Sequence, residues 1–323
     1  MRVFANFPQE LPERPAYPVV TVGVFDGVHR GHQKILATAL EAAGGAAVAV
    51  VTFDPHPRAV LGPPKRGRLL SPLDERLQLL AQWPLAAAVV LRFDQRIAAL
   101  SYIDFVRDAL LGGLGARRLV LGHNVSLGHE RAGNRQTLGA LGRELRFDTI
   151  FVPPIEVNGE AVSSTRIRHL LDAGRVEAAA ELLGRPYAIA GTVVRGSGRG
   201  RVLGIPTANL LVHPDKLVPA NGVYAVRAQV DSTHHAGALN IGVQPTFHAE
   251  GAGQPARTVE VHLLDYTGDL YGTGIRLEVV GRLRDERRFS GPAELVDQVK
   301  RDLEAVRSRL RDATGGLSGR SDS

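Results

Sequence analysis

The stretch Thr21–His32, with the sequence TVGVFDGVHRGH, constrains the fold of this chain more than any other. A β-branched apolar run, Val19–Val24, leads into a turn at Asp26 and Gly27, and a helical pattern of apolar residues follows. This order predicts a strand, a glycine turn and a helix N-terminus. Such a junction presents unpaired N–H groups and the positive end of a helix dipole, so it suits an anion such as a phosphate.

Two histidines in this stretch, His29 and His32, are three residues apart, so they share a helix face and can reach one ligand together. Gly27 and Gly31 let that ligand approach the backbone. A plain glycine turn and a zinc pair are simpler interpretations. However, HxxH without a third ligand nearby, in a chain with no cysteine, is a poor zinc site. The string GxFDGxHxGH from Gly23 resembles instead the phosphate-binding signature of the HxGH nucleotidyltransferases.

Length and composition narrow the class of protein. A chain of 323 residues exceeds a typical single core, so we expect two domains. No run approaches the roughly 20 apolar residues of a membrane span, and no signal-peptide pattern is seen. The absence of cysteine excludes disulfides and makes the cytoplasm the expected location. The net charge of +6 favours anionic ligands, but arginines are interspersed with acids, so charge alone does not indicate nucleic acid.

Residues 19–184 alternate between apolar strand-like runs and helical segments. The expected strands are Val19–Phe25, Ala47–Phe53, Ala87–Phe93, Arg118–Leu121 and Thr149–Val152. The expected helices are Gln33–Ala43, Leu73–Gln82, Tyr102–Leu111, Gln136–Leu145, Thr165–Leu171 and Val176–Leu183. Nearly continuous apolar strands between amphipathic helices predict an α/β domain whose parallel sheet is covered on both faces. Such sheets bind ligands at the carboxyl ends of their strands.

After Gly184 the strand-like runs follow one another closely. They are Ala188–Val194, Ala208–Val212, Val223–Val230, Ala238–Ile241, Val259–Leu264 and Ile275–Val280. This spacing predicts an antiparallel β-barrel or sandwich. A closing helix is expected to start at Ser290 or Gly291 with Pro292, because Leu295, Val299, Leu303, Val306 and Leu310 form an apolar stripe. We therefore expect domains at residues 1–184 and 185–314, with a disordered tail at 315–323.

Three further stretches of the first domain would lie at the ligand edge of the sheet. TFDPHP (52–57) ends the second strand, GHNVSLG (122–128) follows the fourth, and VSSTRIR (162–168) opens a helix. Taken alone, the proline-rich stretch is equally compatible with a plain turn. In the last stretch, Ser163 or Ser164 can serve simply as an N-cap. Hydroxyls together with Arg168 at a helix start also suit a triphosphate.

Together these stretches resemble one family, the bifunctional bacterial riboflavin kinase/FAD synthetases. The resemblance implies that the first domain is a Rossmann-like nucleotidyltransferase, which transfers the adenylyl group of ATP to FMN and releases pyrophosphate. The attacking FMN phosphate is anionic at neutral pH. The reaction therefore needs alignment and charge neutralisation rather than a general base.

The same resemblance implies a set of binding residues. His29 and His32 would act on the ATP phosphates as the catalytic pair. Other ATP and pyrophosphate contacts would come from Gly23, Phe25, Asp26, Gly31, Ser163, Ser164, Thr165 and Arg168. Asn124, Val125 and Leu127 would lie beside the flavin. The family usually carries Phe-x-Phe where this chain has Val125 and Leu127, and branched aliphatic side chains keep apolar contact but lose ring stacking.

The second domain contains a glycine-rich, basic segment at 191–204 that matches neither GxGxxG nor a Walker A loop. A flexible hairpin is its simplest interpretation. In the following PTAN, Thr207 and Asn209 point the same way and offer hard oxygen ligands for Mg²⁺. PTAN after such a loop resembles the riboflavin kinase module, and the likeness extends over nearly the whole chain. It implies a barrel of the riboflavin kinase type. ATP contacts would come from Gly196, Gly198, Gly200 and Arg201, and flavin contacts from Arg287 and Phe289.

Side chains alternate along the strand-like run Thr258–Leu264, which places Glu260 on its polar side. A strand glutamate is usually a solvated surface residue. Riboflavin's 5′-hydroxyl, however, carries a proton that must leave as it attacks the γ-phosphorus of ATP. The resemblance implies that Glu260 is the general base of this step.

The resemblance thus implies an enzyme that makes FMN from riboflavin and FAD from FMN, using ATP and Mg²⁺. We expect small-molecule substrates, no nucleic-acid or membrane partner, and a monomer or weak homo-oligomer. A riboflavin kinase with a degenerate adenylyltransferase domain is one alternative, because the flavin loop is altered. The other is a tRNA- or nucleic-acid-binding nucleotidyltransferase, although no KMSKS-like loop is present and aromatics are only 5% of residues.

Overall fold

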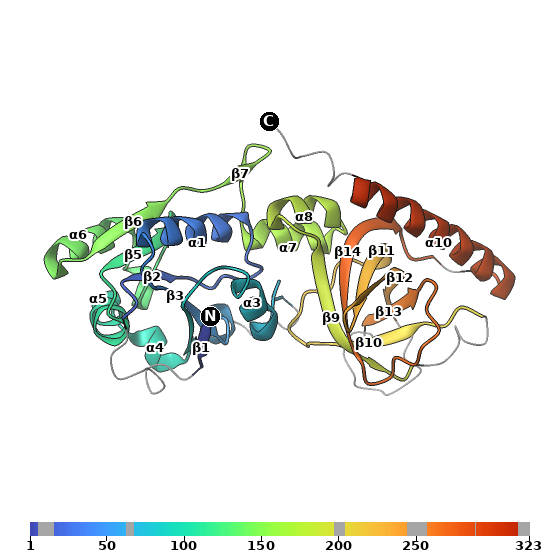
Figure 1. The fold of residues 1–323 in the computed structure, drawn as a ribbon, viewed down its shortest axis with the longest axis horizontal. Coiled ribbons are helices and arrows are strands. Elements are labelled where there is room, and N and C mark those ends of the chain that lie inside the picture. The colour runs from blue at the N-terminus through green and yellow to red at the C-terminus, as the bar shows by residue number, and fades with distance from the viewer. Residues whose placement is uncertain (6–15, 63–67, 197–203, 244–256, 288, 316–323) are drawn as a thin grey trace. The chain divides into compact units, whose positions relative to one another are not determined.

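The computed structural model describes residues 1–5, 16–62, 68–196, 204–243, 257–287 and 289–315. The chain divides into two compact units, Met1–Ser164 and Thr165–Ser323, which are taken in turn below (Figure 1). Apart from Gly315, the predicted tail at 315–323 lies outside the described residues, as do Gly198, Gly200 and Arg201.

The first unit is built on a six-stranded parallel sheet in the order β1-β4-β3-β2-β5-β6. Its strands are β1 (Arg2–Phe4), β2 (Val19–Val22), β3 (Val48–Asp54), β4 (Ala87–Arg92), β5 (Arg118–Gly122) and β6 (Asp148–Val152). After β2 the chain adds β3 and β4 on one side, then returns to add β5 on the other. The switch point therefore lies between the carboxyl ends of β2 and β5, where open α/β sheets bind ligands.

Helices cover both faces of this sheet. They are α1 (Arg30–Ala43), α2 (Pro57–Leu61), α3 (Leu73–Leu80), α4 (Gln95–Ala99), α5 (Tyr102–Asp104), the π-helix η1 (Phe105–Gly113), the 3-10 helix η2 (His129–Arg131) and α6 (Arg135–Leu145). Leu36 of α1 and Leu80 of α3 belong to one apolar core, and Leu110 of η1 and Leu138 of α6 to the other. The predicted two-faced parallel sheet is confirmed.

Several details of the first unit differ from the expected elements, among them the short helices α2, α4 and η2, which were not expected. The predicted helix from Tyr102 continues beyond Asp104 as a π-helix, because the apolar pattern shows a buried face but not the width of each helical turn. The edge strand β1 was not expected, since three residues are too few for a periodic pattern. A short ribbon of β7 (Glu156–Val157) and β8 (Glu160–Ala161) precedes α7.

The second unit is a closed antiparallel barrel in the order β10-β13-β12-β11-β14-β9. Its strands are β9 (Tyr187–Val194), β10 (Ala208–Val212), β11 (Gly222–Val230), β12 (Thr233–Val243), β13 (Arg257–Leu263) and β14 (Gly274–Arg284). The predicted barrel and its closing helix, α10 (Pro292–Gly315), are confirmed. The helices α7 (Ser164–Asp172) and α8 (Val176–Leu183) come before β9, and α8 packs on β9 and β14. For this reason the compact unit begins ahead of residue 185.

The helix α10 is attached to the barrel by both apolar and charged contacts. Val306 shares a buried cluster with Ala225 and Ala238 of the barrel's outer face. The carboxylate of Asp302 is buried and receives the Arg284 guanidinium at 2.7 and 3.0 Å. A paired, hydrogen-bonded charge is the form in which a buried carboxylate is tolerated. Because Ala238 contacts this helix, its side chain faces out of the barrel. Side chains alternate along a strand, so every second residue of β12 counted from Ala238 faces outwards too.

Candidate active sites

The turn after β2 has an unusual backbone. Phe25 and Val28 have φ values of +53° and +39°, in the left-handed region that residues other than glycine seldom adopt. The buried Phe25 ring lies 5.1 Å from the ring of His32, measured between centroids. A Cβ at Gly23 would stand 3.1 Å from the Phe25 ring, so glycine gives this ring room to fold inwards. The turn is therefore shaped by its aromatic residue as well as by its glycines.

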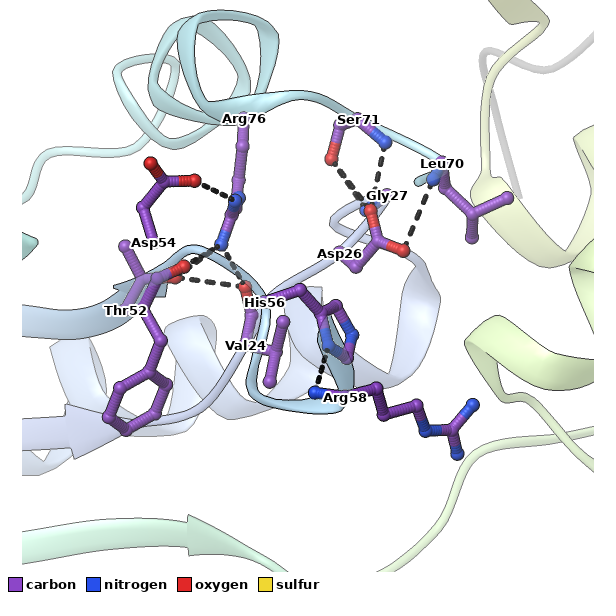
Figure 2. A network of polar contacts seen from close by, with 11 residues as sticks. Val24, Asp26, Gly27, Thr52, Asp54, His56, Arg58, Leu70, Ser71 and Arg76 are labelled. Carbon is purple, nitrogen blue, oxygen red and sulfur yellow. Dashed lines mark hydrogen bonds and ion pairs between the residues drawn. The ribbon is translucent and has the colours of Figure 1, made fainter. Parts of the chain in front are cut away.

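Asp26 holds the turn in place from within the fold (Figure 2). Its carboxylate, only 2% exposed, accepts hydrogen bonds from the backbone N–H groups of Leu70 and Ser71, at 3.1 and 2.8 Å. The Ser71 hydroxyl accepts from the backbone N–H of Gly27 at 2.7 Å. The structure thus gives Asp26, which was predicted to contact ATP, a set of anchoring hydrogen bonds inside the protein.

The two histidines of the motif lie together at the start of α1, as predicted. His29 is the N-cap, and its Nδ1 accepts from the backbone N–H of His32 at 3.4 Å. The rings are stacked, with 3.7 Å between centroids and 17° between planes. A Cβ at Gly31 would stand 3.2 Å from the His29 ring. Glycine at that position therefore leaves space for the imidazole beside the helix N-terminus.

The serine-rich stretch meets the same turn. Ser164 Oγ donates to the backbone carbonyl of Asp26 at 3.1 Å, across a long separation in sequence. Because α7 begins at Ser164, Ser163 occupies the position of its N-cap. Thr165 and Arg168 belong to the second unit; Thr165 is exposed, whereas Arg168 is buried on α7.

The loop after β5 borders an open cavity of about 1270 Å³. Asn124 and Val125, two of the predicted flavin contacts, line it, as do Arg131 and Arg135. The Arg135 guanidinium lies 5.4 Å from the centroid of the Phe151 ring, another lining residue. Leu127 is placed elsewhere. Its side chain is buried in the apolar core beneath η1 and α6, and its backbone pairs with Gly133.

The second candidate site is a row of polar residues across three barrel strands. Glu260 of β13 is directly opposite Asn209 of β10 and also opposite Asn240 of β12. Residues directly opposite on antiparallel strands have Cβ atoms about 4.5–5.5 Å apart on one face. Asn240 is two residues from Ala238, so the row lies on the outer face of the barrel. The predicted base therefore lies between two carboxamides.

Two close approaches position the PTAN segment beside Glu260. A Cβ at Gly196 would lie 2.6 Å from Cγ of Asn209, so a side chain at this position would displace that carboxamide. His262, on the Glu260 face of β13, has Nδ1 2.8 Å from the Pro206 carbonyl. Thr207 is exposed on the same segment. Within the described part of the chain, no group of three or more His, Asp or Glu side chains forms a metal cluster.

The predicted flavin residues near the C-terminus also lie together. The Arg287 guanidinium is 4.7 Å from the centroid of the Phe289 ring and donates to Glu294 at 2.5 Å. The carboxylate of Glu294 also accepts from Ser290, whose backbone hydrogen bond is the main reason why the pKa of Glu294 is lowered. This segment leads into α10.

The sequence interpretation assigned no role to Ser71, Arg76, Asn240 or His262. The alternation along β13 already placed His262 on the polar side with Glu260, so that signal was available. Ser71 and Arg76 carry no comparable signal, since they reach the motif from a separate segment. Arg76 is fully buried beside the same turn.

By its sheet order and its motif, the first unit is an α/β domain of the nucleotidyltransferase type. The second is a β-barrel with a row of polar residues on its outer face. Family models support both. The FAD synthetase model matches residues 11–166 and the riboflavin kinase model matches residues 183–310. The chain belongs to the bifunctional riboflavin kinase/FMN adenylyltransferase family.

Several relatives carry that bifunctional name. The protein of Bacillus subtilis is 38% identical, over 93% of this chain and 96% of the relative. That of Pseudomonas fluorescens is 37% identical over 90% and 92%, and that of Escherichia coli K12 is 36% identical over 88% and 90%. A solved structure named as a macrolide-efflux protein from Streptococcus pneumoniae is 30% identical, with a TM-score of 0.86, and covers 95% of this chain and 99% of its own. Among the described residues, no helix is long and apolar enough to span a membrane.

Proposed function

We infer that this chain is a bifunctional enzyme of flavin-cofactor synthesis, which phosphorylates riboflavin to FMN and adenylylates FMN to FAD. The observation that carries this conclusion is the match of both family models, in order, to the two folded parts of one chain. ATP, riboflavin and FMN are its substrates.

Incubation with riboflavin, ATP and Mg²⁺, followed by chromatography of the flavins, is expected to yield FMN first and FAD later. Formation of neither product would contradict the inference. Accumulation of FMN without FAD, also when FMN is added directly, would favour the kinase-only alternative.

We propose that adenylyl transfer takes place at the turn after β2. An oxygen of the FMN phosphate bonds to the α-phosphorus of ATP, and the bond from that phosphorus to the leaving pyrophosphate breaks. The stacked pair His29 and His32, beside the N-terminus of α1, would bind the ATP phosphates. Ser163, Ser164, Thr165 and Arg168 would bind the departing pyrophosphate. The hydrogen bond from Ser164 to the turn supports this assignment.

For the flavin side we propose contacts from Asn124 and Val125. Both line the cavity after β5, which also presents the arginines Arg131 and Arg135, suited to a phosphate. Leu127 would support this loop from the core instead of touching the ring, because its side chain is buried beneath η1 and α6. On this proposal, FMN binding depends less on the missing aromatic residue at position 127 than on the missing one at position 125.

We propose that riboflavin phosphorylation takes place on the polar row of the barrel. Glu260 would take the proton of riboflavin's 5′-hydroxyl as that oxygen attacks the γ-phosphorus, and ADP would leave. Thr207 and Asn209 would hold Mg²⁺, which neutralises phosphate charge when bound. Their hydroxyl and amide oxygens fit that ion, and Gly196 leaves room for the amide. Gly196, Gly198, Gly200 and Arg201 would approach ATP, and Arg287 and Phe289 the flavin.

Gly196→Ala is expected to weaken Mg²⁺ use by the kinase, because the added methyl group displaces the Asn209 carboxamide. We expect the Mg²⁺ concentration for half-maximal riboflavin phosphorylation to rise about 10-fold or more, the cost typical of losing a residue that orients a metal ligand. Titration of the kinase rate with Mg²⁺ measures it. Gly274→Ala is the control, because a Cβ there meets no atom within 4 Å. Equal Mg²⁺ curves for the two variants would contradict the assignment.

We also propose a cytoplasmic, monomeric or weakly homo-oligomeric enzyme without nucleic-acid or membrane partners. Light scattering coupled to size-exclusion chromatography measures the oligomeric state. Salt-sensitive binding of tRNA would favour the nucleic-acid alternative instead.

A further inference from the structure

Arg76 of α3 is a buried cation with a clear orientation. Its side chain is 1% exposed, and arginine is almost never fully buried unless it is paired. One nitrogen, Nη1, lies 2.9 Å from each of three acceptors, the Val24 carbonyl, Thr52 Oγ1 and the Phe53 carbonyl, which share its two hydrogens. Its Nη2 lies 3.9 Å from Oδ1 of Asp54 (Figure 2).

The electrostatic environment of Arg76 shows what its burial costs. Desolvation lowers the pKa of the guanidinium, and the nearby carboxylates of Asp26 and Asp54 oppose that change. A fully buried cation needs such partners, because it gives up its hydration shell. Arg76 therefore occupies a position that a large apolar side chain would fill without this cost.

The acceptors of Arg76 lie at the ends of two neighbouring strands. Val24 follows β2 and immediately precedes Phe25, the first residue of the turn with positive φ. Thr52 and Phe53 end the buried part of β3, and the Thr52 hydroxyl also donates to the Val24 carbonyl at 2.9 Å. The Val24 carbonyl thus receives two hydrogen bonds just before the backbone turns toward the histidines.

A single short segment, residues 70–76, holds this turn at two places. Ser71 is hydrogen-bonded to Asp26 and Gly27. Arg76, in the first turn of α3, is hydrogen-bonded to the carbonyl of Val24. A backbone segment in a sparsely populated φ/ψ region persists only when several surrounding contacts hold it in that conformation. Hydrogen bonds before and after Phe25 meet that requirement.

We propose that Arg76 is a positioning residue for adenylyl transfer. It acts through Val24 and Thr52 to hold the turn that carries His29 and His32 against the phosphates of ATP. This inference rests on the proposed function of the first unit. A misplacement of about 1 Å at a reacting centre can cost about 100-fold in rate, which is the scale expected here.

The test compares Arg76→Met and Arg76→Lys with FMN and ATP as substrates. In the Met variant we expect kcat for FAD formation to fall about 100-fold, with a much smaller change in KM for ATP. The Lys variant keeps the charge but not the forked donors, so it should recover part of that loss. Riboflavin phosphorylation by the same molecules should stay unchanged, because it takes place on the barrel.

Arg118→Met is the control, at an arginine whose side chain is 36% exposed. Arg118 also donates to a backbone carbonyl, that of Ala42 at 2.7 Å, and pairs with Asp148 at 2.8 Å. It lies at the start of β5, away from the strands' carboxyl ends. The Met substitution there should leave FAD formation unchanged.

Two results would overturn the inference. One is a Met variant whose kcat equals that of the native chain. The other is a loss of rate that matches the fraction of unfolded protein in a thermal melt, with native kcat and KM per folded molecule and no gain on Arg76→Lys. If the native chain itself makes no FAD from FMN, the proposed function fails and the inference falls with it.

Discussion

Glu260→Gln is expected to stop the conversion of riboflavin into FMN while added FMN is still converted into FAD. Glutamine has nearly the same shape as glutamate, so it should keep its position opposite Asn209 and Asn240 on the neighbouring strands. It cannot accept the hydroxyl proton. General-base catalysis typically contributes about 10²–10⁴-fold, so the kinase rate should fall by that factor. Chromatography of the flavins measures both steps in one preparation.

Glu278→Gln provides the matched control for this experiment. Glu278 also lies within a barrel strand, β14, where it pairs with Arg227 at 3.5 Å. Its replacement should leave both steps unchanged. A Glu260→Gln variant that phosphorylates riboflavin at the native rate would show that the base is another group.

His29→Asn is expected to have the opposite effect, so that FMN accumulates from riboflavin and FAD formation is lost. Asparagine is a good helix N-cap, so the start of α1 should survive the change. What disappears is the imidazole stacked on His32. Removing one preorganised group that stabilises transition-state charge costs about 10²–10³-fold, which is the expected fall in the FAD-forming rate.

The two variants serve as controls for each other. Each should retain the step that the other loses, and the thermal unfolding of His29→Asn should resemble that of the native chain. If both substitutions abolish both steps, the division of labour between the units is wrong. If His29→Asn makes FAD normally, the imidazole does not act on ATP.

Local patterns predicted most of the elements that surround these sites. The strand, turn and helix around Asp26 appear as expected, because hydrophobic periodicity and helix-capping residues act over a few positions. The alternation that put Glu260 on the polar side of its strand is also present, with Val259 and Val261 buried. Both patterns depend on neighbours in the chain, which the sequence displays directly.

Other features follow from contacts that are remote in sequence. The loop after β5 shows this most clearly: Val125 lines the cavity, whereas Leu127 is buried in the core, although both are apolar residues two positions apart. Their placement depends on how the loop packs against the helical layer formed by η1 and α6. No local pattern distinguishes the two.

By itself, the sequence determined the two fold classes, their order and the motifs that resemble one enzyme family. Each of these features depends on residues that are close together in the chain. Only the tertiary structure decided which residues support those motifs. Arg76 and Ser71 reach the turn after β2, and Asn240 joins Glu260, through the packing of α3 and the register of β12 on β13. Strand order, register and packing are set by pairings between distant segments, so they appear only when the chain has folded.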